Sequence, residues 1–275
     1  MTVHSDWGEW LPNAVADADP DGIALWYLGC NGFVLKAADD TTLFIDPYLG
    51  TGDPPRTIRM IPIPFAPEDV HEADGVVATH EHTDHTHGPS QAPILTGTDA
   101  SFYGPSAAVG TAEGWTDTHG VDGDDIVELD TGETIEIGSV EIHVEAANDP
   151  DAESPVSYVI EYGSKTFFHG GDARPSRAFE RIGERYDIDL AVVAFGSSGM
   201  IPDKETRVPT YTQWYADENA AAKAANQLRT DRLVPTHWDM WKGLTADPSA
   251  LHDHVRTFSH PRTLEILEIG DRTEI

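Results

Sequence analysis

Four potential metal ligands lie within six residues of one another, at His80, His82, Asp84 and His85. They directly follow the apolar run Gly75–Thr79, which predicts a short buried strand. Alternate side chains of an extended chain share one face, so His80, His82 and Asp84 would point together, and His85 can join them where the chain turns. Imidazole and carboxylate ligands suit zinc, manganese or iron, and two ions about 3.5–4 Å apart could share such a cluster. The pattern therefore favours a metal centre over a set of surface histidines.

Two further candidate ligands lie at the ends of other predicted strands. Asp172 comes shortly after the strand predicted over Lys165–His169, and His237 directly follows the one over Leu233–Thr236. Glycines before Asp172 let the backbone pass close to an ion. We expect the two oxygens of Asp172 to bridge two cations and His237 to bind one of them. The alternatives are a helix N-cap for Asp172 and a core histidine for His237.

Three more residues have expected supporting or structural positions. Asp46 follows the strand predicted over Thr42–Ile45 and can hydrogen-bond a ligand histidine, although a plain turn residue would look the same. His169, three residues before Asp172, is expected beside the ligands or in the core. Cys30 is the single cysteine and lies in a glycine-rich turn, so its expected role is apolar packing.

Short apolar runs separated by turn signals predict a fold dominated by strands, with helices between the later ones. This pattern is typical of an αββα sandwich, in which two mixed sheets pack face to face with helices outside, and we expect one domain over residues 1–275. Tyr48–Pro67 is predicted to be a long loop. The predicted strands are Ile23–Leu28, Gly32–Lys36, Thr42–Ile45, Gly75–Thr79, Asp125–Leu129, Thr134–Ile137, Val140–Ala146, Val156–Tyr162, Lys165–His169, Leu190–Phe195, Leu233–Thr236, Leu264–Ile269 and Thr273–Ile275; the predicted helices are Arg174–Tyr186 and Asp217–Leu228, with a helix and turn in Gly104–Gly114.

The composition is strongly acidic. Forty-eight acidic and 17 basic residues give a formal net charge of −31, a field that repels nucleic acid and anionic membranes. No apolar run approaches the roughly 18 residues of a membrane span, no secretory signal is visible in the sequence, and one cysteine excludes an intramolecular disulfide. We expect a cytoplasmic protein without nucleic-acid or membrane partners, whose acidic surface is adapted to high salt.

The ligand pattern resembles the signature of the metallo-β-lactamase superfamily, with His80, His82, Asp84 and His85 as its motif and Asp172 and His237 as its later ligands. Within it, the chain is similar to the L-ascorbate-6-phosphate lactonase branch from about residue 23 to residue 243. The similar segments are Trp26–Lys36, His80–His85, His169–Asp172, Ile188–Ala191, Ile201–Lys204 and Val234–Trp241.

The resemblance implies an αββα fold and a binuclear manganese or zinc site that hydrolyses lactones or phosphoesters. His80 and His82 would hold one ion, Asp84, His85 and His237 the other, and Asp172 would bridge. Asp84 would orient the attacking water. The remaining ligand falls after the strand that ends near Glu145, where the simplest register places Asn148 and a one-residue shift places Asp149.

The expected activity is hydrolysis of a small lactone or phosphorylated ester by hydroxide formed at two divalent ions, manganese or zinc. The alternatives are a phosphodiesterase or nuclease of the same superfamily, a glyoxalase-type thioester hydrolase, and a non-catalytic metal-binding protein. An anionic substrate needs local positive charge, and Trp238 and Trp241 could wall its pocket. Related lactonases often assemble, which leaves a homo-oligomer open. The cationic candidates are Lys204, which ranks first, and Arg56, Arg59, Arg174, Arg207 and Lys242.

Salt adaptation predicts that folding depends on ionic strength, because concentrated ions screen the self-repulsion of a −31 chain. We expect the protein to unfold on dialysis from molar KCl into dilute buffer, as followed by circular dichroism and thermal melting. A melting temperature that does not change between the two conditions would contradict this interpretation of the composition.

Overall fold

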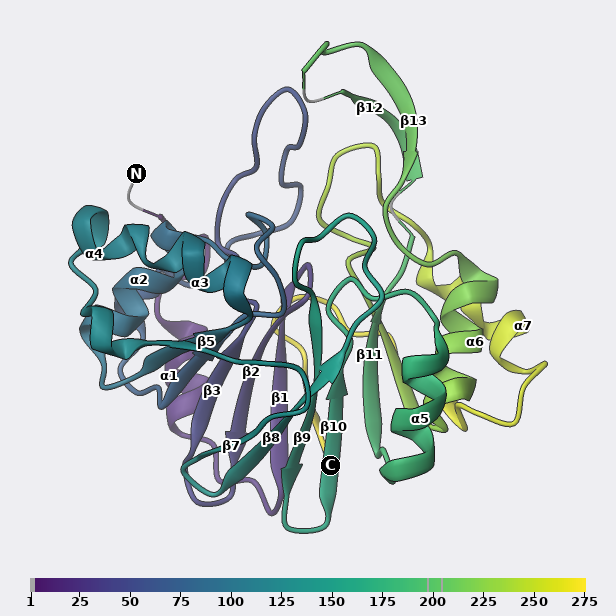
Figure 1. The fold of residues 1–275 in the computed structure, drawn as a ribbon, viewed down its shortest axis with the longest axis horizontal. Coiled ribbons are helices and arrows are strands. Elements are labelled where there is room, and N and C mark those ends of the chain that lie inside the picture. Colours follow the sequence, from purple (N-terminus) through teal and green to yellow (C-terminus); the bar gives the residue numbers. More distant parts are fainter. Residues whose placement is uncertain (1–2, 197, 204) are drawn as a thin grey trace.

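Two mixed β-sheets of seven strands each stack face to face, and helices cover both outer faces (Figure 1). This computed structural model describes residues 3–196, 198–203 and 205–275. The first sheet has the order β16-β1-β2-β3-β4-β5-β6 and the second β15-β14-β11-β10-β9-β8-β7. The arrangement confirms the predicted αββα sandwich.

The strands of the first sheet are β1 (Ile23–Gly29), β2 (Gly32–Ala37), β3 (Thr42–Ile45), β4 (Gly75–Val77), β5 (Ser101–Gly104), β6 (Ile126–Glu128) and β16 (Arg272–Glu274). Those of the second are β7 (Thr134–Ile137), β8 (Val140–Ala146), β9 (Val156–Tyr162), β10 (Lys165–His169), β11 (Leu190–Ala194), β14 (Arg232–Thr236) and β15 (Thr263–Leu264). Two more strands, β12 (Ser198–Pro202) and β13 (Pro209–Gln213), form a separate hairpin.

The helices divide between the two outer faces. The N-terminal half supplies α1 (Trp10–Ala16), α2 (Gly88–Gly97), α3 (Ser106–Ala112) and α4 (Gly114–His119), and the C-terminal half supplies α5 (Arg177–Arg185), α6 (Glu218–Leu228) and α7 (Leu251–Val255). Short 3₁₀ turns are η1 (Pro67–Asp69), η2 (Gly123–Asp125) and η3 (Pro248–Ala250). Among the residues that the structure describes, no helix has the length and apolar content needed to cross a membrane.

Three apolar layers hold the sandwich together. The central layer lies between the sheets and contains fully buried Tyr27, Phe33 and Tyr158. One outer layer lies under α1 to α4, and the other lies under α5 to α7. Strands between two such layers are buried on both faces, so β1, β3 and β11 are almost wholly apolar and buried throughout.

Some predicted boundaries are wrong for local reasons. Strand β15 contains only Thr263 and Leu264, so the strand predicted over Leu264–Ile269 is mostly loop. Helix α5 begins at Arg177, where the Ser176 side chain accepts a hydrogen bond from Ala178 N. Helices α1 and α2 were not predicted, because prolines and glycines obscure the helical pattern of α2 and α1 is only seven residues long.

The loops after β4, β8, β10 and β14 meet at one edge of the two sheets, the upper edge in Figure 1, together with the β1–β2 turn. Hydrogen bonds cross between them: His237 N donates to Cys30 O at 2.8 Å, and Val156 N donates to Thr79 O at 3.0 Å. The long loop after β3 and the β12–β13 hairpin project beyond this edge. The fold thus brings together the strand ends that carry the candidate ligands.

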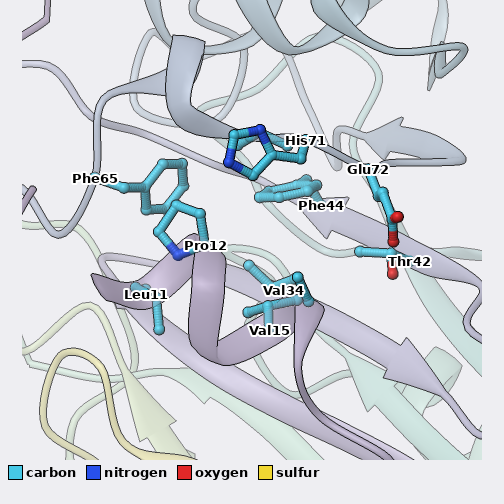
Figure 2. A pocket seen from close by; sticks show the side chains of 11 residues that line it. Leu11, Pro12, Val15, Val34, Thr42, Phe44, Phe65, His71 and Glu72 are labelled. Atoms are coloured by element: carbon cyan, nitrogen blue, oxygen red, sulfur yellow. The ribbon is translucent and has the colours of Figure 1, made fainter. Parts of the chain in front are cut away.

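A small apolar cleft lies elsewhere, between α1 and the outer face of the first sheet (Figure 2). Leu11 and Val15 of α1 line it, facing Val34 and Phe44 of the sheet, with His71 at its rim. It is part of the packing of α1 and is separate from the edge that carries the candidate ligands.

Lys36 on β2 is buried beneath α1, where its ammonium group caps the end of the helix. Nζ donates to Val15 O at 3.2 Å and Ala16 O at 2.9 Å, and it pairs with Asp40 at 3.1 Å. A cation at the carbonyl end of a helix interacts favourably with the helix dipole. The Lys36 side chain is 2% exposed, whereas that of Asp40 is 78% exposed.

We expect Lys36→Met to lower the free energy of unfolding by about 1–3 kcal/mol, because two carbonyls lose their buried donor. Asp40→Asn removes only the exposed side of the ion pair and should cost less than about 1 kcal/mol. Denaturant unfolding in molar KCl measures both changes. Equal losses for the two variants would contradict the capping role of Lys36.

Candidate metal centre

Eight side chains form two donor groups at the common edge. The first consists of Cys30, Asp84, His85 and His237, and the second of His80, His82, Asp149 and Asp172. Within each group, the candidate ligand atoms all lie within 4.8 Å of one another. All of these residues are buried except Asp84 and His82, which are partly exposed.

Asp172 lies between the two groups. Its Oδ1 is 3.4 Å from His85 Nε2 and 3.6 Å from His237 Nε2, whereas its Oδ2 is 3.8 Å from His80 Nε2. Asn31 Nδ2 donates to Oδ1 at 2.7 Å and fixes the carboxylate. One carboxylate thus faces both donor groups, as a bridging ligand must.

The residue before Asp172 has to be glycine for the chain to fit. Gly171 adopts φ = +54°, and a Cβ there would lie 2.8 Å from Thr79 Oγ1. The turn after β10 therefore packs directly against the start of the histidine-rich segment. This close approach brings Asp172 next to His80 and His85.

Asp46 lies beside the centre and hydrogen-bonds His85, the kind of contact that the sequence predicts. Its Oδ1 accepts from Thr79 N at 2.8 Å, and its Oδ2 accepts from Thr79 Oγ1 at 2.7 Å and from His85 Nδ1 at 2.8 Å. A carboxylate that accepts from Nδ1–H leaves the lone pair on Nε2. His85 Nε2 is buried with no hydrogen-bond partner, so this nitrogen faces the centre and can take a ligand there.

The electrostatics favour the protonation states that metal ligands need at His80, Asp84 and Asp172. Burial, with His85 as a charged neighbour, lowers the pKa of His80 to about 3, so its imidazole is neutral. Burial alone would raise the pKa of the Asp172 and Asp84 carboxyls, but His85 and His237 outweigh it and hold both values well below the usual range. At neutral pH the centre presents neutral imidazole at His80 and ionised carboxylates at Asp84 and Asp172.

Asp149, not Asn148, occupies the second donor group. Asn148 is exposed, and its backbone oxygen accepts from Arg174 N at 2.9 Å. Asp149 is buried, and its Oδ2 lies 3.9 Å from His80 Nε2 with no hydrogen-bond partner. Burial and the neighbouring Asp172 raise its pKa, which is the effect expected of an acid held beside a second carboxylate without a cation.

Comparison with known proteins places the chain in a family. The family described as "Beta-lactamase superfamily domain" matches residues 41–238, which include all of these donors except Cys30. The chain belongs to the metallo-β-lactamase superfamily.

Relatives within and around this superfamily differ in chemistry. The chain is 26% identical to "Probable L-ascorbate-6-phosphate lactonase UlaG" of Escherichia fergusonii, over 91% of this chain and 80% of that protein. Igni18, a metallo hydrolase of Ignicoccus hospitalis, has a similar structure, with a TM-score of 0.67, 21% identity, and coverage of 92% of this chain and 99% of its own. The diiron β-hydroxylase CmlA of Streptomyces venezuelae has a TM-score of 0.66 and 17% identity, and the match covers 93% of this chain and 55% of the CmlA chain. The last two likenesses show the fold alone.

The structure gives most of the predicted substrate-binding residues other surroundings than a substrate pocket. Arg59 donates hydrogen bonds to three backbone oxygens, from Nε to Ile61 at 3.0 Å, from Nη1 to Tyr48 at 2.8 Å and from Nη2 to Pro62 at 2.7 Å, so it stabilises its own loop. Arg207 is exposed in the turn of the β12–β13 hairpin. Trp238 donates to Pro235 O at 3.1 Å and packs against the layer under α6. Lys204 lies outside the described residues.

His169 and Cys30, for which the sequence predicts supporting or structural roles, both lie beside the centre. His169 Nε2 donates to Asn31 O at 2.8 Å, so it supports the residue that holds Asp172. Cys30 packs with Tyr48 and Trp241, but its Sγ also lies 3.1 Å from His237 Nε2. Burial, together with Asp84 and Asp172, raises the pKa of the Cys30 thiol well above its usual value.

Sequence reasoning missed several residues around the centre. Tyr215 stacks on His237 with ring centroids 3.9 Å apart, and nothing in the sequence marks it. Asn31 is signalled only by its place beside Cys30 in the β1–β2 turn. Its side chain touches both Asp172 and Thr236.

A third group of potential ligands lies away from this edge. Glu141, His143 and Glu161 come together on β8 and β9, where the His143 ring faces Tyr186. His143 Nδ1 lies 2.9 Å from Thr134 Oγ1, and Nε2 lies 2.7 Å from a Glu161 oxygen. Both ring nitrogens have protein partners, which distinguishes this group from the centre around His85.

The neighbours Asn148 and Asp149 offer a matched test of the second donor group. We expect Asp149→Ala to lower the metal content of protein purified without chelator by about one ion per chain, because a buried ligand is lost. Asn148→Ala should leave the content unchanged, because that side chain is exposed. Elemental mass spectrometry measures both, and a loss with Asn148→Ala alone would overturn the assignment.

Proposed function

We propose that this protein is a metal-dependent hydrolase of a small lactone or phosphorylated ester, with two divalent ions held by the two donor groups. The observation that carries the proposal is the position of Asp172, whose two oxygens face different groups of otherwise buried donors. His85 Nε2 and Asp149 Oδ2 are buried without hydrogen-bond partners. Such orphaned atoms are costly unless something binds them, and a cation satisfies both.

The spacing of the donors fits a metal ion. Around a tetrahedral zinc ion with bonds of about 2.0–2.2 Å, nitrogen and oxygen ligands lie roughly 3.3–3.6 Å apart. His237 Nε2 lies 3.3 Å from Asp84 Oδ2, and His85 Nε2 lies 3.4 Å from Asp172 Oδ1. The mixture of imidazole and carboxylate suits both zinc and manganese, and the proposal includes either.

Bound ions would supply a hydroxide near neutral pH and polarise a carbonyl or phosphoryl oxygen. The chain's own groups do the rest. Asp84 is the partly exposed carboxylate of the centre, with a side chain 20% exposed, so it can accept a hydrogen bond from the attacking water and orient it. Asp172 is held by Asn31 and stays ionised. The centre needs no serine or cysteine nucleophile.

The positions of two arginines support an anionic substrate. Arg174 Nη2 donates to Trp214 O at 2.9 Å and to Asp151 at 3.1 Å, and the backbone oxygen of Asp151 lies 3.1 Å from His82 Nε2. Arg56 lies over the ring of Trp214, 5.5 Å from its centroid. The Nε atoms of both arginines are buried without partners. Arg56 and Arg174 are therefore the preferred candidates for contact with an anion, in place of Arg59 and Arg207.

The substrate class rests on the relative as well as the site. The lactonase of E. fergusonii aligns with 91% of this chain, and the name of that protein indicates a phosphorylated lactone. Identity of 26% leaves room for a different substrate. We therefore propose the class, a small anionic lactone or ester, and not one compound.

The test is a panel of lactones, phosphorylated lactones and phosphodiesters with metal-loaded protein. We expect hydrolysis of an anionic lactone or ester, and we expect His82→Ala to lower kcat/KM by more than about 100-fold, beyond the roughly 10–100-fold cost of losing a supporting contact. His143→Gln is the matched control, because His143 belongs to a separate acidic group and should leave turnover unchanged.

The other outcomes each exclude the proposal in a different way. Turnover of phosphodiesters without turnover of lactones would show a phosphodiesterase. Full metal loading without turnover of any substrate would show a non-catalytic metal-binding protein. Hydrolysis that persists unchanged in His82→Ala would remove the metal centre from the mechanism.

A further inference from the structure

Cys30 stands among the metal donors, in a position that apolar packing alone does not explain. Its Sγ lies 3.1 Å from His237 Nε2 and 3.7 Å from Asp84 Oδ2. All four ligand atoms of the group that also contains His85 lie within 4.8 Å of one another. Cys30 is fully buried and is the single cysteine of the chain.

The distance from Cys30 Sγ to Asp84 Oδ2 fits a shared ion. In a tetrahedral zinc site with a Zn–S bond of about 2.3 Å and Zn–N and Zn–O bonds of about 2.0–2.2 Å, sulfur lies roughly 3.5–3.7 Å from each neighbouring ligand atom. The distance from Cys30 Sγ to Asp84 Oδ2, 3.7 Å, lies at the upper end of this range, and the distance to His237 Nε2, 3.1 Å, lies below it, so the sulfur contacts the imidazole directly before an ion binds. His237 Nε2 and Asp84 Oδ2, which face the sulfur, are themselves 3.3 Å apart. The three atoms form one triangle of potential ligands.

The environment of His85 is an independent indication that an ion binds at this triangle. A thiol–imidazole hydrogen bond would account for the contact between Cys30 and His237, but it leaves His85 unexplained. His85 is fully buried, its Nδ1 is occupied by Asp46, and its Nε2 has no hydrogen-bond partner. That nitrogen belongs to the same donor group as Cys30 Sγ, so an ion there would contact both.

The backbone holds Cys30 in place before any ion binds. Cys30 adopts φ = 59°, and its carbonyl accepts from His237 N at 2.8 Å and from the Tyr27 hydroxyl at 3.0 Å. The next residue, Asn31, holds Asp172. The β1–β2 turn thus fixes the sulfur of one donor group and the carboxylate that faces both.

We infer that Cys30 is a thiolate ligand of the divalent ion held by Asp84, His85 and His237, and that it biases this group towards zinc. The inference rests on the metal centre of the proposed function. The thiol gives up its proton to solvent when the ion binds, and a sulfur–metal bond forms. Thiolate is a soft ligand that favours zinc, whereas manganese favours oxygen. The group of His80, His82 and Asp149 has only nitrogen and oxygen donors and lacks this bias.

Cobalt(II) absorption tests the inference on the intact protein. We expect titration of Co²⁺ into metal-free wild type to produce a sulfur-to-cobalt charge-transfer band in the near ultraviolet, which nitrogen and oxygen ligands do not give. Because the chain has one cysteine, the band can arise only from Cys30. It should stop growing once the group that contains Cys30 is filled, be absent in Cys30→Ser and persist in Asp149→Ala, which alters the other group.

Metal competition gives a second measurement. Cys30→Ser should weaken zinc binding by at least about tenfold, the lower end of what loss of a supporting contact alone costs. Its manganese affinity should not fall, because serine keeps an oxygen donor in place of sulfur. Zinc binding should also release one proton fewer in Cys30→Ser than in wild type. Equal losses for zinc and manganese would contradict the selectivity.

The outcomes separate this inference from the proposed function. Cobalt that binds with visible ligand-field bands but no sulfur band would overturn the role of Cys30 and leave the metal centre intact. A chain that binds no cobalt, zinc or manganese would overturn both. Because the decisive spectrum is that of wild type, the result does not depend on how well Cys30→Ser folds.

Discussion

The structure depends on the burial of one carboxylate, Asp172, between two sets of metal donors. Placing an ionised group there is unfavourable unless charge and hydrogen bonds compensate for the lost hydration. Asn31 supplies the hydrogen bond, and His85 and His237 supply the electrostatic stabilisation. Each of these partners comes from a different strand end. The sandwich must therefore hold several loops within a few ångströms of one another, and the three apolar layers supply the rigidity that this requires.

Unusual backbone conformations gather where those loops meet. Cys30, Asp46 and His237 all have positive φ values, of 59°, 46° and 65°. Left-handed backbone is unfavourable for residues with a Cβ and persists where the surroundings enforce it. Here each of the three places a donor or a supporting carboxylate at the centre. Strain at these positions is offset by burial and by the hydrogen bonds around Thr79 and Cys30.

The sequence predicts the fold class and the motif residues because both follow from local pattern. The apolar runs that become β1, β4 and β11 predict buried strands, and His80–His85 follows shortly after the end of β4. The ligand after β8 could not be chosen in this way. Asn148 and Asp149 are neighbours in a loop, and the loop is held by a long-range contact between Asn148 O and Arg174 N that no local pattern contains.

Long-range contacts explain the remaining differences. The sequence marks Arg59 as a candidate contact for an anion, but the carbonyls that it binds become neighbours only when the long loop folds back on itself. Tyr215 stacks on a histidine more than twenty residues away in sequence. Cys30 lies opposite His237 because the β1–β2 turn meets the end of β14, and no local pattern contains that pairing.

The same geometry would reconcile an acidic protein with the anionic substrate that we propose. A formal charge of −31 repels anions at low ionic strength, but in molar salt the screening length falls to about 3 Å. Acidic side chains on the outer surface then contribute little at the centre, and the groups in direct contact decide. In the proposed function, those groups would be the bound cations and, beside Trp214, Arg56 and Arg174. Charge at the site and charge of the whole protein are thus independent, so the acidic composition does not argue against a phosphorylated substrate.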